Sequence, residues 1–164
     1  MANTEENLKA AFAGESQANR KYLAFAAQAE KEGLPQAARL FRAVAAAETI
    51  HAHAHLRTMG GIGTTAENLK EALAGEIHEF KNMYPQMIAT AKEEGHKTAE
   101  RSFTYANEVE KIHAELYRQA LTELEHMAAA DYYVCSVCGY TAAKASPAKC
   151  PVCGATAKAF FKAE

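Results

Sequence analysis

Apolar and polar residues are interleaved along roughly the first 130 positions, which are rich in the strong helix formers Ala, Glu, Lys, Leu and Gln. Glycine-containing breaks near residues 33, 60 and 95 divide this region into four segments. Capping-box spacing marks the start of the first segment (Asn3, Glu6) and of the third (Thr64, Glu67). The pattern predicts a mainly α fold with four helices, at residues 4–32, 35–59, 65–94 and 97–129.

The helical region contains an internal repeat. The segment Ala13-Gly14-Glu15 recurs sixty-one positions later as Ala74-Gly75-Glu76, and after a slip of one residue the register becomes sixty-two. In that register the sequence ETIHA at 48–52 pairs with EKIHA at 110–114. The four helices are therefore predicted to be two copies of one helix hairpin. Of the three histidines within residues 51–55, only the first has a histidine counterpart.

Each predicted hairpin carries a glutamate early in its first helix and a Glu-x-x-His pair in its second. A Glu and a His three residues apart project from the same helical face, so both side chains can reach a common metal. Ferritin-like di-iron and di-manganese bundles use this combination of ligands. The candidate metal ligands of the helical region are Glu15, Glu48, His51, Glu76, Glu79, Glu110 and His113. A mostly carboxylate site with two imidazoles favours iron or manganese over zinc.

The spacing of a Glu-x-x-His pair is weak evidence by itself. It also occurs at Glu93/His96 and at Glu123/His126, where a solvated pair is the simpler interpretation. The two pairs that repeat lie in mid-helix among Ala, Val, Phe and Ile, where burying a carboxylate is costly unless a metal or hydrogen bonds compensate. This costly placement favours a metal site.

Tyr22 and Tyr84 are candidates for supporting that site. Each lies seven or eight residues after the glutamate of its hairpin's first helix, on roughly the same side of the helix. Their phenol groups could donate hydrogen bonds to ligand carboxylates, or they could be ordinary core tyrosines. The sequence leaves both interpretations open.

All four cysteines lie near the C-terminal end, in two CxxC motifs formed by Cys135 with Cys138 and by Cys150 with Cys153. A glycine after the second cysteine of each motif permits the tight turn of a metal knuckle. About thirty residues cannot build an independent hydrophobic core, so metal binding must drive the folding of this segment. Taken alone, such a pair of motifs more often holds structural zinc than iron. A one-electron iron centre makes chemical sense beside a dinuclear iron bundle.

Length, composition and charge narrow the function classes. The 164 residues are 49% hydrophobic, which suits one medium domain, or one domain with a small appendage. A formal charge of −2 and an isoelectric point near 6.4 give no basic field for nucleic acid or anionic lipid. The start MANTEENLKA lacks the features of a signal peptide, and no apolar run is long enough to span a bilayer. We therefore expect a cytoplasmic protein without nucleic-acid or membrane partners.

Together these motifs resemble the rubrerythrin family over essentially the whole chain. The matching segments are AFAGESQA, the two repeated Glu-x-x-His pairs, GEIHEFKNMYP and CxxCGY…CPxCG. The resemblance implies a ferritin-like four-helix bundle over residues 1–130 and a rubredoxin-like domain over residues 131–164. It also implies that the seven carboxylate and histidine side chains bind a non-haem di-iron centre, while the four cysteines bind a single rubredoxin-type iron.

The activity implied by the resemblance is the reduction of hydrogen peroxide to water, in protection against oxidative stress. Electrons are expected from an external donor, such as a rubredoxin or its NAD(P)H-linked reductase, and reach the di-iron pair through the cysteine-bound iron. The implied catalytic residues are Glu48, Glu79, Glu110 and His51. Glu48 and Glu110 are expected to bridge the irons. Glu79 and His51 are expected to exchange as ligands, the carboxylate binding in the diferric state and the imidazole in the diferrous state, since the ferric ion favours an anionic oxygen.

The linker between the second and third helices is too short for the ferritin-like topology within one chain. Those helices run parallel in such a bundle, so the gap that the linker must cross is roughly 30 Å at 1.5 Å per residue. Five or six residues extend to only about 20 Å. We therefore predict that two chains exchange hairpins in a domain-swapped homodimer, with a simple antiparallel bundle as the alternative.

Two other functions compete with peroxide reduction. A ferroxidase or iron-storage protein of the ferritin-like class would use the same bundle, but the cysteine domain has no role there and would hinder a closed shell. A non-catalytic zinc-ribbon interaction protein with a vestigial bundle does not account for the complete set of seven ligands.

Overall fold

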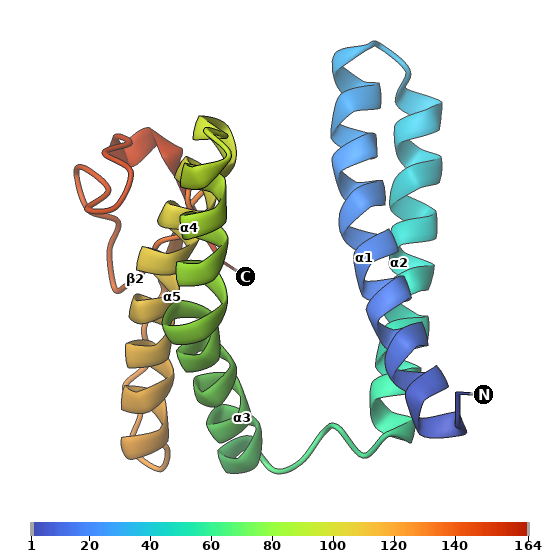
Figure 1. The fold of residues 1–164 in the computed structure, drawn as a ribbon, viewed down its shortest axis with the longest axis horizontal. Helices are drawn as coiled ribbons and strands as arrows, with labels where there is room; N and C mark the ends of the chain where they lie inside the picture. Colours follow the sequence, from blue (N-terminus) through green and yellow to red (C-terminus); the bar gives the residue numbers. More distant parts are fainter. Residues whose placement is uncertain (1, 164) are drawn as a thin grey trace. The chain divides into compact units, whose positions relative to one another are not determined.

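The computed structural model describes residues 2–163, and the chain divides into two compact units at the boundary between Gly63 and Thr64. The first unit is a helix hairpin. The second contains another hairpin and a small C-terminal sheet (Figure 1). The expected mainly α fold with a small four-cysteine C-terminal region is confirmed. The division into domains at residue 130 stays a prediction.

The first hairpin consists of α1 (Thr4–Lys31) and α2 (Pro35–Thr58), which run antiparallel (Figure 1). Helix α1 begins with a complete capping box, in which Asn3 and Glu6 bond each other's backbone N–H groups. Gly33 ends the helix at φ +74°, a conformation that glycine adopts without steric cost. The two helices pack through a core of small side chains around Ala26, Ala29 and Ala38.

The second hairpin begins in the same way and then differs. Helix α3 (Thr65–His78) starts with the Thr64–Glu67 capping box and continues into the π-helix η1 (Glu79–Met83) and then α4 (Tyr84–Glu93). Helix α5 (Lys97–Thr122) returns alongside them (Figure 1). The single helix predicted over 65–94 is therefore interrupted by a π-helical turn.

The π-helix explains the slip in the sequence repeat. A π-bulge accommodates one extra residue in an α-helix by widening one turn. The register changes from sixty-one to sixty-two between the Glu15/Glu76 and Tyr22/Tyr84 pairs, and η1 lies between Glu76 and Tyr84. The extra residue is absorbed there, so the later part of the hairpin stays in phase with its counterpart.

The predicted end of the last helix is wrong. We expected it to extend to residue 129, but α5 ends at Thr122 and is followed by a turn in which His126 N–H donates to the carbonyl of Glu123. The three alanines at 128–130 favour a helix by propensity. Their preference is overridden because the chain leads directly into the first strand of the sheet.

The sheet has three antiparallel strands in the order β2-β1-β3. Strand β1 (Tyr132–Cys135) lies in the centre, between β2 (Thr141–Ala143) and β3 (Phe160–Lys162). A short 3₁₀ turn, η2 (Ala157–Ala159), precedes β3. Cys135 and Cys150 are nearly inaccessible, so the thiols themselves occupy the centre of this region.

Candidate metal centres

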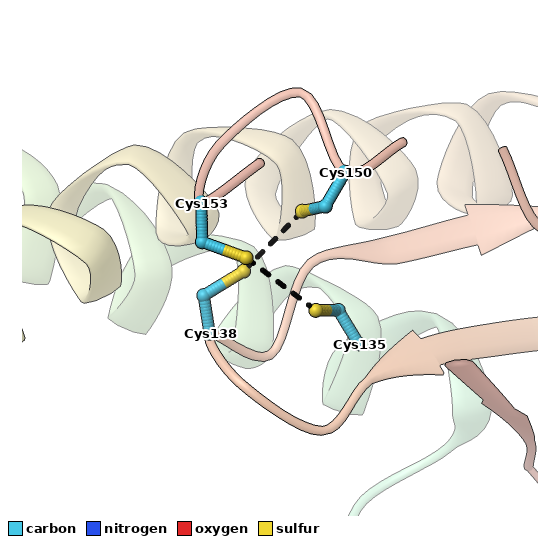
Figure 2. Close-up of side chains that lie close together, drawn as sticks. All are labelled: Cys135, Cys138, Cys150 and Cys153. Carbon is cyan, nitrogen blue, oxygen red and sulfur yellow. Dashed lines mark hydrogen bonds between the residues drawn. The ribbon is translucent and has the colours of Figure 1, made fainter. Parts of the chain in front are cut away.

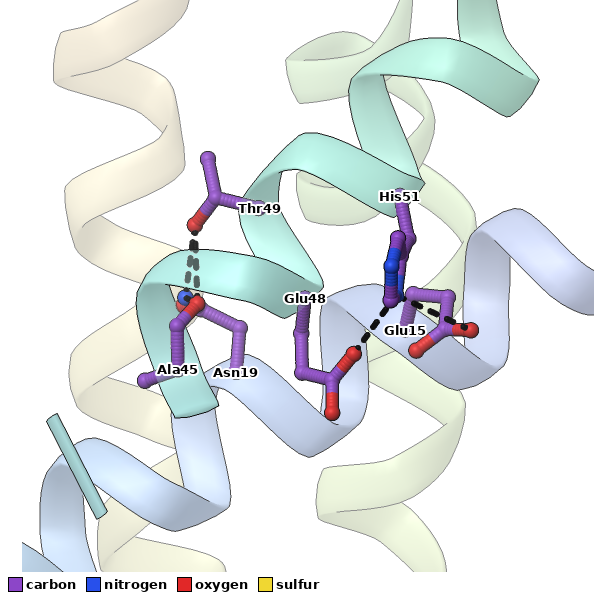
Figure 3. Close-up of polar contacts among 6 residues, drawn as sticks. All are labelled: Glu15, Asn19, Ala45, Glu48, Thr49 and His51. Atoms are coloured by element: carbon purple, nitrogen blue, oxygen red, sulfur yellow. Dashed lines mark hydrogen bonds and ion pairs between the residues drawn. The ribbon is translucent and has the colours of Figure 1, made fainter. Parts of the chain in front are cut away.

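The first hairpin brings three of the predicted ligands together (Figure 3). Glu15 projects from α1, and Glu48 and His51 project from α2. The Nδ1 atom of His51 lies 2.9 Å from Oε2 of Glu48 and 3.9 Å from Oε1 of Glu15. The His51 side chain is 56% exposed in this unit. One ligand atom from each residue fits within 4.8 Å, which is the spacing of a metal site.

A buried amide fixes the relative position of the helices that carry this group. Asn19, one turn after Glu15, donates from Nδ2 to the carbonyl of Ala45 at 2.7 Å and to the hydroxyl of Thr49 at 2.8 Å (Figure 3). Asn19 is only 7% exposed, and leaving this amide without partners would be costly. The contact therefore sets the register in which Glu15 of α1 faces Glu48 of α2.

The second hairpin repeats the arrangement with nearly the same distances. The Nδ1 atom of His113 lies 2.8 Å from Oε2 of Glu110 and 3.9 Å from Oε2 of Glu76. These residues project from α5 and α3, and their ligand atoms also lie within 4.8 Å of one another. The His113 side chain is 25% exposed, less than half the exposure of His51.

The less exposed histidine also has partners on its second ring nitrogen. Nε2 of His113 lies 3.1 Å from the Thr141 hydroxyl and 3.3 Å from the Gly139 carbonyl. The Thr141 hydroxyl itself donates to that carbonyl. The imidazole therefore donates from Nε2, which leaves the Nδ1 lone pair directed at Glu110 and available for a metal. In the described part of the chain, Nε2 of His51 has no such partner.

The carboxylates of the second hairpin are electrostatically strained without a cation. Burial, together with Glu110 and Glu79, raises the pKa of Glu76 to about 7. Burial and Glu110 also raise the pKa of Glu79. Among the described residues, neither Glu76 nor Glu110 forms an ion pair with lysine or arginine. A di-iron pair would supply the missing positive charge, and oxygen and imidazole donors suit iron, so the residues fit this group.

Glu79 stands apart from the three-residue group. It is the first residue of η1, and it does not belong to the cluster formed by Glu76, Glu110 and His113. It still lies close enough to Glu110 for their charges to interact. Its role as a ligand stays a prediction.

The two tyrosines pack as aromatic residues in the described chain. Tyr22 contacts Phe25 and Phe41, and Tyr84 contacts Phe103. Neither phenol donates a hydrogen bond to a ligand carboxylate there. Burial, followed by the nearby Glu79, raises the pKa of Tyr84, so this phenol does lie near the carboxylates. Their supporting role stays a prediction.

The four cysteines of the C-terminal region converge from the end of β1 and the turns of the two CxxC motifs (Figure 2). Sγ of Cys135 lies 3.7 Å from that of Cys153, and Sγ of Cys138 lies 3.5 Å from that of Cys150. These separations exceed a disulfide bond and match thiolates around one ion. Gly139 and Gly154 have φ angles of +84° and +77°, as expected for the two knuckle turns.

Thiolate is favoured at one of the four cysteines. Burial acts to raise the pKa of Cys150, but hydrogen bonds from the N–H groups of Cys153 and Val152, together with those from the thiols of Cys138 and Cys153, lower that pKa to about 7. Burial raises the pKa of Cys138 and of Cys153. Four thiols that compete for protons in this way are stabilised together when a metal replaces the protons.

Comparison with known proteins agrees with both centres. A family model described as rubrerythrin matches residues 6–121, and a second, described as the rubrerythrin rubredoxin-like domain, matches residues 133–161. The chain belongs to the rubrerythrin family. Rubrerythrin-2 of Clostridium acetobutylicum is 38% identical over 93% of this chain and 92% of its own length. Nigerythrin of Nitratidesulfovibrio vulgaris is 38% identical over 93% of this chain and 83% of its own.

Solved structures of nigerythrin resemble this rubrerythrin-family chain. The partially reduced state and the fully reduced, all-ferrous state each give a TM-score of 0.61 at 36% identity, and cover 99% of this chain and 88% of theirs. The chain thus carries the glutamate and histidine groups of a di-iron site and the four-cysteine site of a rubredoxin-like domain. Family membership supports an oxidoreductase with a peroxidase-type role in oxidative-stress protection. None of the described helices has the length and apolar character needed to cross a membrane.

The sequence did not predict the contacts that hold the second ring nitrogen of His113, Nε2. Gly139 and Thr141 follow the first CxxC motif, 26 and 28 residues after the histidine. A metal-binding imidazole needs a partner for its second nitrogen, but the sequence does not show where that partner lies. The π-helix did leave a signal, because the repeat register slips by one residue at its position.

Proposed function

We propose that this protein reduces hydrogen peroxide to water, using electrons that an external donor delivers to the four-cysteine iron. One peroxide takes two electrons and two protons and gives two waters. A loaded dinuclear site would supply both electrons in one encounter, whereas an iron held by the four cysteines would carry one at a time. A rubredoxin or its NAD(P)H-linked reductase is the proposed kind of donor.

The chain's own residues have distinct proposed roles in the dinuclear centre. Glu48 and Glu110, one from each three-residue group, would hold both irons, and Glu15 and Glu76 would each supply a further carboxylate. His113 binds through Nδ1, because its Nε2 donates to Gly139 and Thr141. When bound, the irons supply reversible one-electron redox chemistry and Lewis acidity.

Glu79 and His51 are proposed as alternative ligands. The His51 side chain is 56% exposed in its unit, and its polar contacts within the described residues are the carboxylates of its own hairpin. Glu79 lies on the π-helix, outside the group formed with His113. Neither side chain has a fixing contact like those on Nε2 of His113 among the described residues, which supports an exchange between redox states.

The observation that carries the proposal is the direct contact between the two kinds of metal site within the second unit. One ring nitrogen of His113, Nδ1, faces the carboxylate of Glu110. The other, Nε2, donates to the carbonyl of Gly139, the residue after Cys138. A thiolate ligand and a histidine ligand are thus separated by one hydrogen bond and a short length of backbone. This contact supports a route for electrons from the cysteine site to the dinuclear site.

We further propose that two chains exchange hairpins, so that each di-iron centre takes one three-residue group from each chain. Helix α2 continues ten residues beyond Glu48, and α3 begins eleven residues before Glu76. At about 1.5 Å per residue, a parallel arrangement of these helices leaves roughly 30 Å to cross. Residues 59–64 extend to only about 20 Å. Light scattering measures the mass in solution, and absorption reports the di-iron site. A monomeric protein whose absorption spectrum shows an intact di-iron site would overturn this assembly.

The test of the function is anaerobic stopped-flow oxidation of the fully reduced protein, with peroxide and dioxygen in separate experiments. We expect rapid oxidation of the di-iron site by peroxide, followed by oxidation of the cysteine-bound iron. Metal analysis should give about three irons per chain. Zinc in the cysteine site, or oxidation by dioxygen alone, would overturn the proposal. Accumulation of ferric mineral during turnover would instead favour the ferroxidase and iron-storage alternative.

The variant Cys153→Ser separates the two half-reactions. It should abolish reduction by an external protein donor, because the cysteine-bound iron is lost. The chemically reduced di-iron site should still be oxidised by peroxide at close to the unmodified rate. Equal loss of both reactions would contradict the division of labour between the sites.

A further inference from the structure

The four-cysteine region has a charge opposite to that of the rest of the chain. Residues 131–164 contain four lysines against one aspartate and one glutamate. The remaining residues hold fourteen of the eighteen basic and eighteen of the twenty acidic side chains. A net charge of −2 for the whole chain therefore conceals a basic C-terminal region attached to an acidic helical one.

Three of these lysines carry uncompensated charge. Lys162 forms an ion pair with Asp131 at 2.8 Å. Lys144, Lys149 and Lys158 are exposed and form no ion pair within the described residues.

Two of the free lysines lie beside the metal knuckles. The side chain of Lys149 lies 3.5 Å from the position that a Cβ atom on Gly154 would take, directly after Cys153. Lys158 belongs to η2, where the carbonyl of the next residue, Ala159, accepts from the backbone N–H of Ser136 in the first knuckle. Lys149 is thus next to the second knuckle, and Lys158 is next to the first.

The first knuckle, whose Ser136 bonds the residue after Lys158, also carries an exposed apolar residue. Val137 lies inside the first CxxC motif, directly before Cys138, and its side chain is 58% exposed. An exposed apolar side chain within a charged rim is the usual composition of a protein interface. On helix α5 of the same unit, Glu115 is paired with Arg118 and Glu108 with Lys111, so the charges of these two acids are already neutralised.

We propose that Val137, Lys149 and Lys158 form the docking surface for an acidic electron-transfer protein, which delivers its electron directly to the cysteine site. The inference rests on the proposed function and specifies its partner by charge. A basic rim raises the rate of encounter with an acidic partner by roughly 10- to 1,000-fold at low ionic strength. The apolar centre then brings the two redox centres close in a short-lived complex, which small interfaces permit.

A competing role for the same lysines is to balance the charge of the thiolates. Lysines near an iron–thiolate site would then raise its reduction potential without affecting any partner. The two roles differ in their dependence on salt and on the charge of the reductant, because only docking depends on a protein partner.

The experiment measures reduction of the oxidised cysteine-bound iron by its visible absorbance, in the full-length iron-loaded protein without peroxide. The probes are a reduced rubredoxin of net negative charge and, separately, reduced methyl viologen, which is a small cation. The test variant is the double charge reversal Lys149→Glu with Lys158→Glu. The matched control is Lys9→Glu with Lys70→Glu, which changes the net charge equally at exposed lysines of α1 and α3.

We expect the test variant to slow reduction by rubredoxin at least tenfold at low salt, and the difference to disappear at high salt. The control should be slowed no more than about twofold, and methyl viologen should not be slowed in either variant. An equal loss in the two variants, or a salt-independent rate with rubredoxin, would overturn the docking surface. A shifted reduction potential with an unchanged rubredoxin rate would also overturn it, in favour of charge balance. Oxidation by peroxide is measured separately, so a failure here leaves the proposed function standing.

Discussion

The two hairpins are built from one sequence pattern, yet they hold their metal-site histidines differently. In both, Nδ1 of the histidine lies within 3 Å of the glutamate three residues before it and 3.9 Å from the glutamate of the opposite helix. His51 is more than half exposed in its unit, whereas His113 is 25% exposed and is held on its other nitrogen by Gly139 and Thr141.

The hairpins differ at their first helices as well. The second hairpin contains the π-helix η1, which begins with the fifth carboxylate, Glu79. The first hairpin has an unbroken helix at that place and instead has the Asn19 contact with Ala45 and Thr49. The two hairpins therefore carry similar three-residue groups, and the histidine of the second is also held by residues that follow the first CxxC motif.

The largest expected effect comes from removing each histidine in turn. In the air-oxidised protein, His113→Ala should lose about one of the two di-iron metals, because it removes a ligand held in place by second-nitrogen contacts. His51→Ala should retain both, because its ligand role is proposed for the reduced state. Iron per chain, measured after gel filtration, checks this. His53→Ala, on the exposed side of α2, serves as the control. Equal losses in the two variants would show that the histidines are equivalent.

The contact between Nε2 of His113 and the Thr141 hydroxyl can be tested separately. Thr141→Val removes the hydroxyl near Nε2 and should weaken iron retention in the di-iron site by about tenfold, the lower end for partners of metal-bound histidines. The affinity is measured by competition with a chelator. Thr141→Ser keeps the hydroxyl and should behave like the unmodified protein. If serine and valine have the same effect, packing rather than the hydrogen bond is responsible.

Deleting one residue from the π-helix should make the second hairpin more like the first. Asn82 is exposed in η1, so its removal allows an unbroken helix without disturbing the core. We expect the apoprotein to unfold at an equal or slightly higher temperature, by up to ~4 °C for each kcal/mol gained. The oxidised iron site should bind less firmly, since Glu79 is displaced. Loss of helical circular dichroism, or unchanged iron binding, would contradict this role for the π-helix.

The smallest effects are expected where the hairpins agree. Asn3→Ala and Thr64→Ala each remove a capping-box side chain and should each cost about 1 kcal/mol in urea unfolding. In the second box, backbone and hydroxyl bonds from Thr64 lower the pKa of Glu67 below 4.5. A lowered carboxyl pKa stabilises the fold at neutral pH, and the effect is lost as the pH falls through the lowered value. The cost of Thr64→Ala should therefore shrink in acid, and a constant cost would contradict the contribution of Glu67.

Much of the architecture could be predicted because the relevant signals are local. Gly33 and Gly95 end their helices through the same pair of backbone bonds, and the capping boxes occur at both predicted starts. Helix propensity predicted α5 incorrectly beyond Thr122, because the connection to β1 outweighs three favourable alanines. Local preference amounts to less than 1 kcal/mol per residue, so the path of the chain can override it.

The sequence alone determined which residue types form the two metal groups, since ligand chemistry and the three-residue helical spacing are properties of the chain itself. The repeat showed that residues 48–52 and 110–114 are equivalent, and the paired CxxC motifs predicted a four-thiolate site. Only the tertiary structure decided that the equivalent histidines are held differently. The Gly139 and Thr141 contacts join residues 26 and 28 positions apart, and such contacts arise only when the sheet packs against α5.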